Sequence, residues 1–141
     1  MLTASSAAIA ANIVLYYFIT GIMGIRLVAL EQYPPPEVVP LPVTDVILFS
    51  FIFSAGGCLV FFIIANTTDH PRLIFIGISL IVLLLSIILP LRIPTPPVPM
   101  STKWSLVSMH ILGAAVLVPL LVVISLPKNI GNVILNGVKN L

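Results

Sequence analysis

Residues 73–89 read LIFIGISLIVLLLSIIL, a run without a single charged side chain. At about 1.5 Å per residue, a helix of this length reaches roughly 26 Å, which is near the shortest that crosses the hydrocarbon core of a bilayer. So long an apolar run is typical of a transmembrane helix. We therefore expect lipid, and not water, to surround this segment.

Three further apolar stretches flank this run, at residues 4–30, 44–65 and 104–126. No Lys or Arg precedes the first stretch, and it is longer than a signal-peptide core, so we expect it to be retained as a span. The connectors on either side of spans two and three are rich in proline, which favours extended chain, and the break at 66–72 is short and polar. The sequence predicts an all-α membrane protein, an antiparallel four-transmembrane-helix bundle in residues 1–126.

The tail at residues 127–141 has an amphipathic pattern. As a helix, it would place its apolar residues on one face, namely Ile130, Val133, Ile134, Val138 and Leu141. This pattern predicts a short interfacial helix. Gly131 and Gly137 each cost a helix ~1 kcal/mol, so a non-helical tail is the alternative.

The composition excludes several classes of function. Charged residues are 7% of the chain, and the six basic residues are scattered, with no row that could neutralise phosphates, so nucleic acid is not an expected partner. Cys58 is the only cysteine, which rules out an internal disulfide and any multi-cysteine metal site. No catalytic set, glycine-rich phosphate loop or metal-ligand spacing is present. We predict a non-enzymatic protein without a cofactor.

His110 is expected about seven residues into the fourth span, or ~10 Å below the membrane surface. It could serve as a proton relay or ligand contact, or hold a single haem or chlorophyll beside Gly113 and Ala114. Alternatively, its imidazole donates a structural hydrogen bond to a neighbouring helix. His70 lies near the opposite membrane face, so one chain cannot clamp haem between the two histidines.

Arg26 is the costliest polar group if it lies deep in the first span, because a charge at mid-membrane costs roughly 2.5 to 3.5 kcal/mol. Its side chain is expected to snorkel to the interface, and Glu31, little more than one turn later, is a candidate ion-pair partner. The alternative is an anion or lipid-headgroup contact shared with Arg92 and Lys103. Asp45 opens the second span and is expected to complement the helix dipole.

Small residues within the spans predict close helix contacts. They are Thr20, Gly24, Ser50, Ser54, Gly57, Gly113 and Ala114. Asn12 and Tyr16 add polar groups to the first span, which we expect to serve helix pairing. Pro119 leaves the carbonyl of Ala115 without its usual partner and predicts a kink in the fourth span.

The segment LIVLLLSIILPL (80–91), followed after a loop by KWSLVSMHILGAAVLVPLL (103–121), resembles the closing half of an uncharacterised bacterial family of small four-span membrane proteins. The matching positions are Pro90, Met109, His110, Ala114, Ala115 and Pro119. The resemblance implies the four-span fold and a bacterial plasma membrane. It implies no activity, because this is a domain of unknown function.

Three functions stay open. The first is a structural or accessory subunit of a membrane assembly, with membrane lipids and other membrane subunits, or further copies of itself, as partners. The second is a small oligomeric transporter or channel that uses His110 and Arg26. The third is a binder of lipid, quinone or pigment between helices. The Lys and Arg count is equal on the two sides, and the acidic residues near Arg26 favour cytoplasmic N- and C-termini.

Overall fold

The computed structural model describes residues 2–31, 37–93 and 98–124. Its elements are α1 (Leu2–Tyr17), the π-helical turn η1 (Phe18–Ile22), α2 (Val43–Thr67), α3 (Pro71–Arg92) and α4 (Met100–Ile124). Within the described residues, α1 with η1, α2, α3 and α4 are each long and apolar enough to cross a bilayer. The predicted four-helix membrane fold is therefore confirmed. The predicted tail helix at 127–141 lies outside the described residues.

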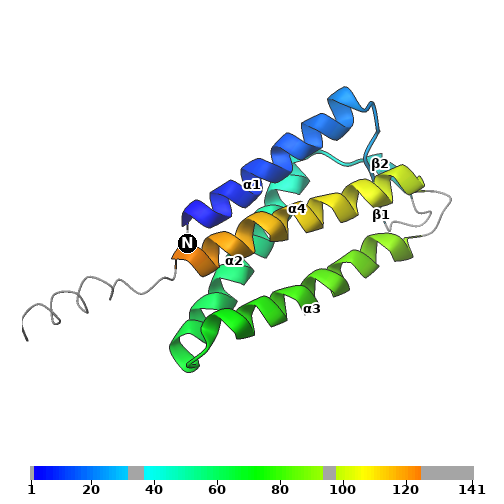
Figure 1. Ribbon diagram of the computed structural model, residues 1–141. Coiled ribbons are helices and arrows are strands. Elements are labelled where there is room, and N and C mark those ends of the chain that lie inside the picture. Colours follow the sequence, from blue (N-terminus) through cyan, green and yellow to red (C-terminus); the bar gives the residue numbers. More distant parts are fainter. Residues whose placement is uncertain (1, 32–36, 94–97, 125–141) are drawn as a thin grey trace, which may run out of the picture.

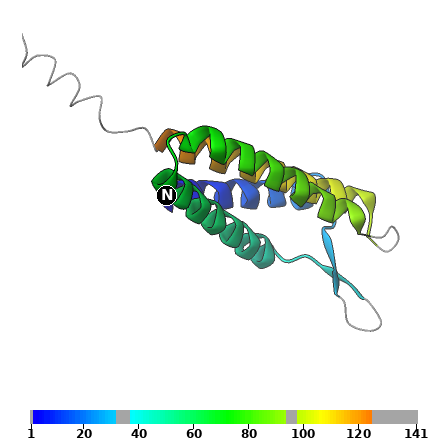
Figure 2. The ribbon, with the colours of Figure 1, turned by 90° about the horizontal axis from the view of Figure 1, so that it is seen from below.

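The helices alternate in direction. In Figure 1, α4 lies between α1 and α3, and α2 packs against the other three helices. The N-terminal end of α1, the turn between α2 and α3, and the last turn of α4 lie at one end of the bundle. The connector after α1 lies at the opposite end, as Figure 2 also shows. This arrangement suits four successive crossings of a bilayer.

The buried core is small and divided into two clusters. The terminal cluster, near the N-terminus, consists of Ala4, Cys58, Phe61, Ile64, Phe75 and Leu121. The hairpin cluster, at the other end, consists of Ile19, Leu27, Val46 and Met109. In the terminal cluster, the rings of Phe61 and Phe75 meet edge to face at 4.9 Å and join α2 to α3. Many large apolar side chains elsewhere are exposed, which lipid tolerates because acyl chains are as apolar as leucine.

The first connector contains a β-hairpin that the sequence analysis did not predict. Strands β1 (Val28–Glu31) and β2 (Glu37–Pro40) pair antiparallel, with Val28 opposite Pro40 and Glu31 opposite Glu37. The first helical segment ends at Ile22, so the predicted span to residue 30 is wrong at this end. Gly24 explains the end, because its φ of +65° is left-handed, a conformation that glycine adopts without strain and that stops a helix.

The prolines near the third connector have less effect than predicted. Helix α3 continues through Pro90 to Arg92, and at 22 residues it reaches about 33 Å, so it crosses a bilayer with length to spare. Helix α4 begins at Met100, ahead of the predicted residue 104, and runs through Pro119 to Ile124. The kink at Pro119 stays a prediction.

Gly24→Ala is expected to lower the free energy of unfolding by about 1 kcal/mol, because an alanine Cβ is strained in the left-handed region. Gly21→Ala is the matched control. Gly21 is exposed, has no positive φ, and a Cβ built on it meets no atom within 4 Å. Its replacement should not lower stability. Denaturant titration of both variants in detergent measures the difference, and equal stabilities would contradict the role given to Gly24.

Candidate functional site

A buried amide joins three helices in the middle of the bundle. Asn12 of α1 donates through Nδ2 to Ser50 Oγ of α2 at 2.9 Å. A Cβ built on Gly113 of α4 would lie 3.2 Å from the same Nδ2, so α4 approaches closely because residue 113 has no side chain. Asn12 is only 9% exposed, and its Oδ1 has no hydrogen-bond partner among the described residues. We call Asn12, Ser50 and Gly113 the polar node.

The other predicted packing residues of α2 and α4 occupy different surroundings. Ser54 is buried, and its hydroxyl donates to Phe51 O of its own helix at 3.1 Å. A Cβ built on Gly57 would lie 3.0 Å from Leu117 Cδ2 of α4, which makes residue 57 a close contact between these helices. Ala114 is half-buried in α4.

The predicted contact point at Thr20 and Gly24 does not form between helices. The Thr20 hydroxyl donates to Tyr16 O within the first helical segment at 2.8 Å. Gly24 is exposed, and a Cβ built on it meets no atom within 4 Å. The two residues are not one turn apart on a helix, because the helix ends before Gly24 is reached.

His110 is half-buried on α4 and bonds within its own helix. Its Nδ1 lies 2.7 Å from Leu106 O, and since a carbonyl oxygen can only accept, Nδ1 is the donor. In the neutral ring, Nε2 is therefore an acceptor. The ring of Phe53 on α2 lies edge-on at 6.2 Å. This bond differs from the predicted one, because its acceptor is on α4 and not on a neighbouring helix.

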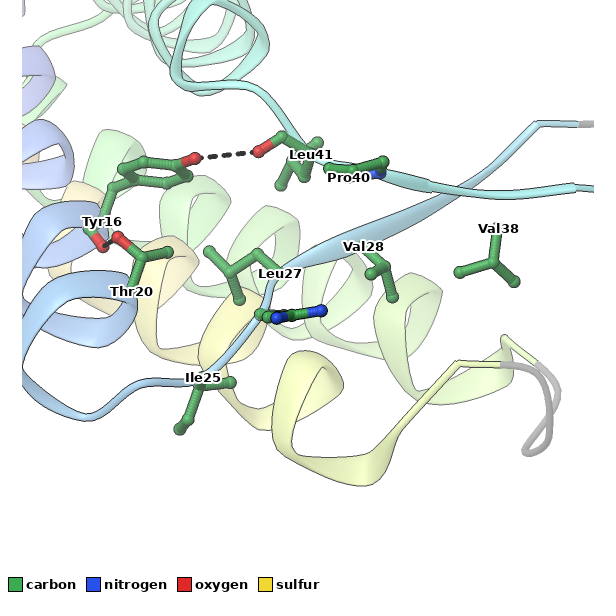
Figure 3. Close-up of a pocket in the computed structure, with 9 residues that line it drawn as sticks. Tyr16, Thr20, Ile25, Leu27, Val28, Val38, Pro40 and Leu41 are labelled. Carbon is green, nitrogen blue, oxygen red and sulfur yellow. Dashed lines mark hydrogen bonds between the residues drawn. The ribbon is translucent and has the colours of Figure 1, made fainter.

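A cavity of about 450 Å³ lies where the first helical segment meets the hairpin. Its lining residues are Tyr16, Thr20, Ile25, Arg26, Leu27, Val28, Val38, Pro40 and Leu41. Figure 3 shows Tyr16 pointing across to Leu41, whose carbonyl accepts the phenol proton at 3.0 Å. Val28 and Val38 project from the two strands on the other side. The cavity is mostly apolar, and Arg26 provides its formal charge.

Arg26 lies outside the helices, in the connector between η1 and β1, and is exposed. Its backbone carbonyl accepts a hydrogen bond from Thr102 Oγ1 of α4 at 3.2 Å. The prediction that it snorkels from within a span is therefore wrong. Glu31 is not one helical turn away, since it ends strand β1, roughly 10 Å along the strand from Val28. The side chain of Glu31 lies outside the described residues.

Asp45 lies in the first turn of α2 and is half-buried. Helix N-termini carry partial positive charge, so a carboxylate at this position is favourable. That role stays a prediction.

A model of a family of unknown function, DUF6069, matches residues 1–124. The chain belongs to the DUF6069 family. No curated protein and no solved structure matches the chain. Membership in DUF6069 brings no activity with it, so any function must be argued from the structure itself.

The sequence analysis did not predict a set of buried polar residues at the start of α4. Thr102, Lys103 and Ser105, in the first turns of α4, are all at most 6% exposed. Thr102 lies in α4 and bonds to the connector at Arg26. Nothing in the local sequence signals this, because the contact joins residues 76 positions apart.

The polar node can be tested by a double-mutant cycle. Asn12→Ala removes the bond to Ser50 and should cost about 0.6 kcal/mol, the average for such bonds in membrane proteins. Gly113→Ala places a methyl group against the Asn12 amide and should also destabilise. In the double variant the clash is gone, so its loss should be smaller than the sum by at least about 0.5 kcal/mol. Unfolding in detergent measures the cycle, and additive losses would contradict the contact.

Proposed function

We propose that the protein is a non-enzymatic accessory subunit of a membrane assembly. It binds a transmembrane helix of another subunit at Gly56 of α2 and Gly77 of α3, two outward-facing positions that we call the glycine notches. The observation that supports this proposal is the environment of Gly56 and Gly77. Both are exposed on apolar helices, Gly56 in the middle of α2 and Gly77 in the second turn of α3, and a Cβ built on either meets no atom within 4 Å.

Large apolar side chains surround each notch. On a helix with 100° per residue, the neighbours within about 60° of Gly56 lie three, four and seven positions away. On α2 the exposed residues at these positions are Phe49, Ile52, Phe53, Leu59, Val60 and Ile63. On α3, the corresponding exposed residues around Gly77 are Leu73, Ile74, Leu80, Ile81 and Leu84. At each notch the glycine thus leaves a depression between large apolar side chains, which a side chain or the backbone of another helix fills.

A protein partner accounts for these notches better than lipid does. Glycine in a helix costs ~1 kcal/mol relative to alanine, and mobile acyl chains give no compensation for leaving a hole. Helix association in membranes depends on packing, for which small residues let two backbones approach closely. The neighbouring Gly57 illustrates this use inside the bundle, where it contacts Leu117 of α4.

The transporter alternative receives less support from the geometry. Arg26 is tied to Thr102, and His110 lies eight residues further along α4, or about 12 Å deeper. His110 is not among the residues that line the cavity containing Arg26. The two residues therefore do not share one path among the described residues.

Leucine at either notch should weaken the complex without unfolding the protein. Gly56→Leu and Gly77→Leu each fill the hole, and we expect about a tenfold loss of the co-purifying subunit, as ~1–2 kcal/mol of helix packing implies. Ala115→Leu, at an exposed position of α4, is the control and should retain the complex. Native mass spectrometry from lipid discs reads the composition directly.

Two outcomes of this experiment would contradict the accessory role. A wild-type protein found only as a monomer leaves the notches without a partner. A complex that contains only copies of this chain would make the protein self-assembling. Loss of folded protein, checked by circular dichroism in each variant, would show that a notch belongs to the internal packing.

For localisation, we propose the bacterial plasma membrane with both ends of the chain in the cytoplasm. The four crossings found among the described residues, an even number, and the acidic residues near Arg26 support this orientation. A fluorescent reporter that matures only in the cytoplasm, fused to the C-terminus, should be bright in cells, whereas a periplasmic phosphatase at the same site should be inactive. The reverse pair of results would contradict the proposed orientation.

A further inference from the structure

We propose that the cavity at the hairpin end binds one anionic phospholipid, whose phosphate pairs with Arg26 and whose acyl chain lies along the apolar wall. This inference does not depend on the proposed subunit contact. It follows from which groups in the cavity are still able to donate a hydrogen bond.

The two hydroxyl groups of the lining have already used their protons. Tyr16 donates to Leu41 O at 3.0 Å, and Thr20 donates to Tyr16 O at 2.8 Å. The remaining side chains of the lining are aliphatic, apart from that of Arg26. A guanidinium offers five N–H donors in a fork that fits a phosphate or a carboxylate. The cavity therefore suits a molecule with one anionic end and an apolar remainder.

The position of the cavity places it at the boundary of the hydrocarbon core. The first helical segment ends at Ile22 and α2 begins at Val43, so Arg26 and the strand residues Val28 and Val38 lie just outside the spans. Phospholipid headgroups occupy this level in a bilayer. Figure 3 shows the two valines on the side of the cavity opposite Tyr16, where they form part of an apolar wall.

In the strand register, the acidic residues of the hairpin lie at the end away from its base. Glu31 and Glu37 pair with each other across the strands, at the end opposite Val28 and Pro40, roughly 10 Å along the hairpin. Glu37 is not among the residues that line the cavity, and no ion pair of Arg26 is found among the side chains that the structure describes. The base of the hairpin thus presents the positive charge of Arg26, which complements an anionic headgroup.

This chemistry distinguishes the lipid from other sources of phosphate. A free phosphate ion would depend on a single guanidinium and would leave the aliphatic lining exposed to water. A zwitterionic lipid would carry its own ammonium group next to Arg26, and the two cations repel each other. A lipid with a net negative headgroup, such as phosphatidylglycerol, fits both the charge and the apolar wall.

The test uses the full chain in lipid discs that contain phosphatidylglycerol diluted in phosphatidylcholine, with native mass spectrometry as the readout. Arg26→Gln should lower retention of phosphatidylglycerol about fivefold, which corresponds to ~1 kcal/mol for one basic residue. Arg26→Lys should retain part of the binding. The fold should persist in both, because the backbone carbonyl of Arg26, and not its side chain, bonds to Thr102.

Arg92→Gln is the matched control. Arg92 is an exposed basic residue in the last turn of α3, at the same end of the bundle as the hairpin, and it does not line the cavity. Its replacement should leave retention unchanged. Equal losses in the Arg26 and Arg92 variants would overturn the proposal, because they would indicate attraction by general surface charge.

Three further results would also overturn it. One is unchanged retention in Arg26→Gln, and another is equal retention of phosphatidylcholine and phosphatidylglycerol by the wild-type chain. The third is displacement of the lipid by millimolar inorganic phosphate, which would indicate a site for a soluble anion.

A fourth variant, Val38→Trp, fills the cavity from the strand and should lower retention while Arg26 is kept.

Discussion

Pairing of backbone hydrogen-bonding groups controls this structure, because no water is available inside a bilayer to satisfy an N–H or C=O that the protein leaves open. The four helices meet this requirement within each span. The connector after η1 lies just outside the spans, and separate hydrogen bonds pair its backbone groups. Met23 N donates to Phe18 O, Ile25 N to Ile19 O, and Leu41 N to Leu27 O. Side chains of the bundle complete the pairing, since Thr102 donates to Arg26 O and Tyr16 to Leu41 O.

Two of these bonds lie beside the cavity. Tyr16 donates to Leu41, just before α2, and Thr102 donates to the connector at Arg26. The space between them is lined by the strand valines and by Tyr16 and Thr20, whose protons point to backbone carbonyls. Hydroxyl groups whose protons are used in these bonds cannot donate to a ligand. The guanidinium of Arg26 therefore determines which ligand the cavity can bind.

Hydropathy located the second, third and fourth spans, because a long apolar run in lipid has few alternatives to a helix. The prolines were poor guides to the bounds of α3 and α4. The first span was harder. Residues 25–30 read IRLVAL, which is as apolar as much of a helix, and hydropathy does not separate an apolar helix from an apolar strand. The available signals were Gly24 and the valines on either side of the proline-rich loop, which favour a turn and strands.

For the candidate sites, the sequence identified the residue types but not their neighbours in the fold. Sequence reasoning selected Arg26 for its charge but placed it in a span, so it assigned the wrong neighbours. Residue type alone also does not show which of two adjacent glycines lies inside the bundle. Gly56 and Gly57 are adjacent, yet residue 57 contacts Leu117 inside the bundle while residue 56 faces outward without a neighbour. A 100° step around the helix makes this difference, and only the packing of α2 against α4 decides which glycine lies inside. The glycine that the bundle leaves unused is then the one available to a partner.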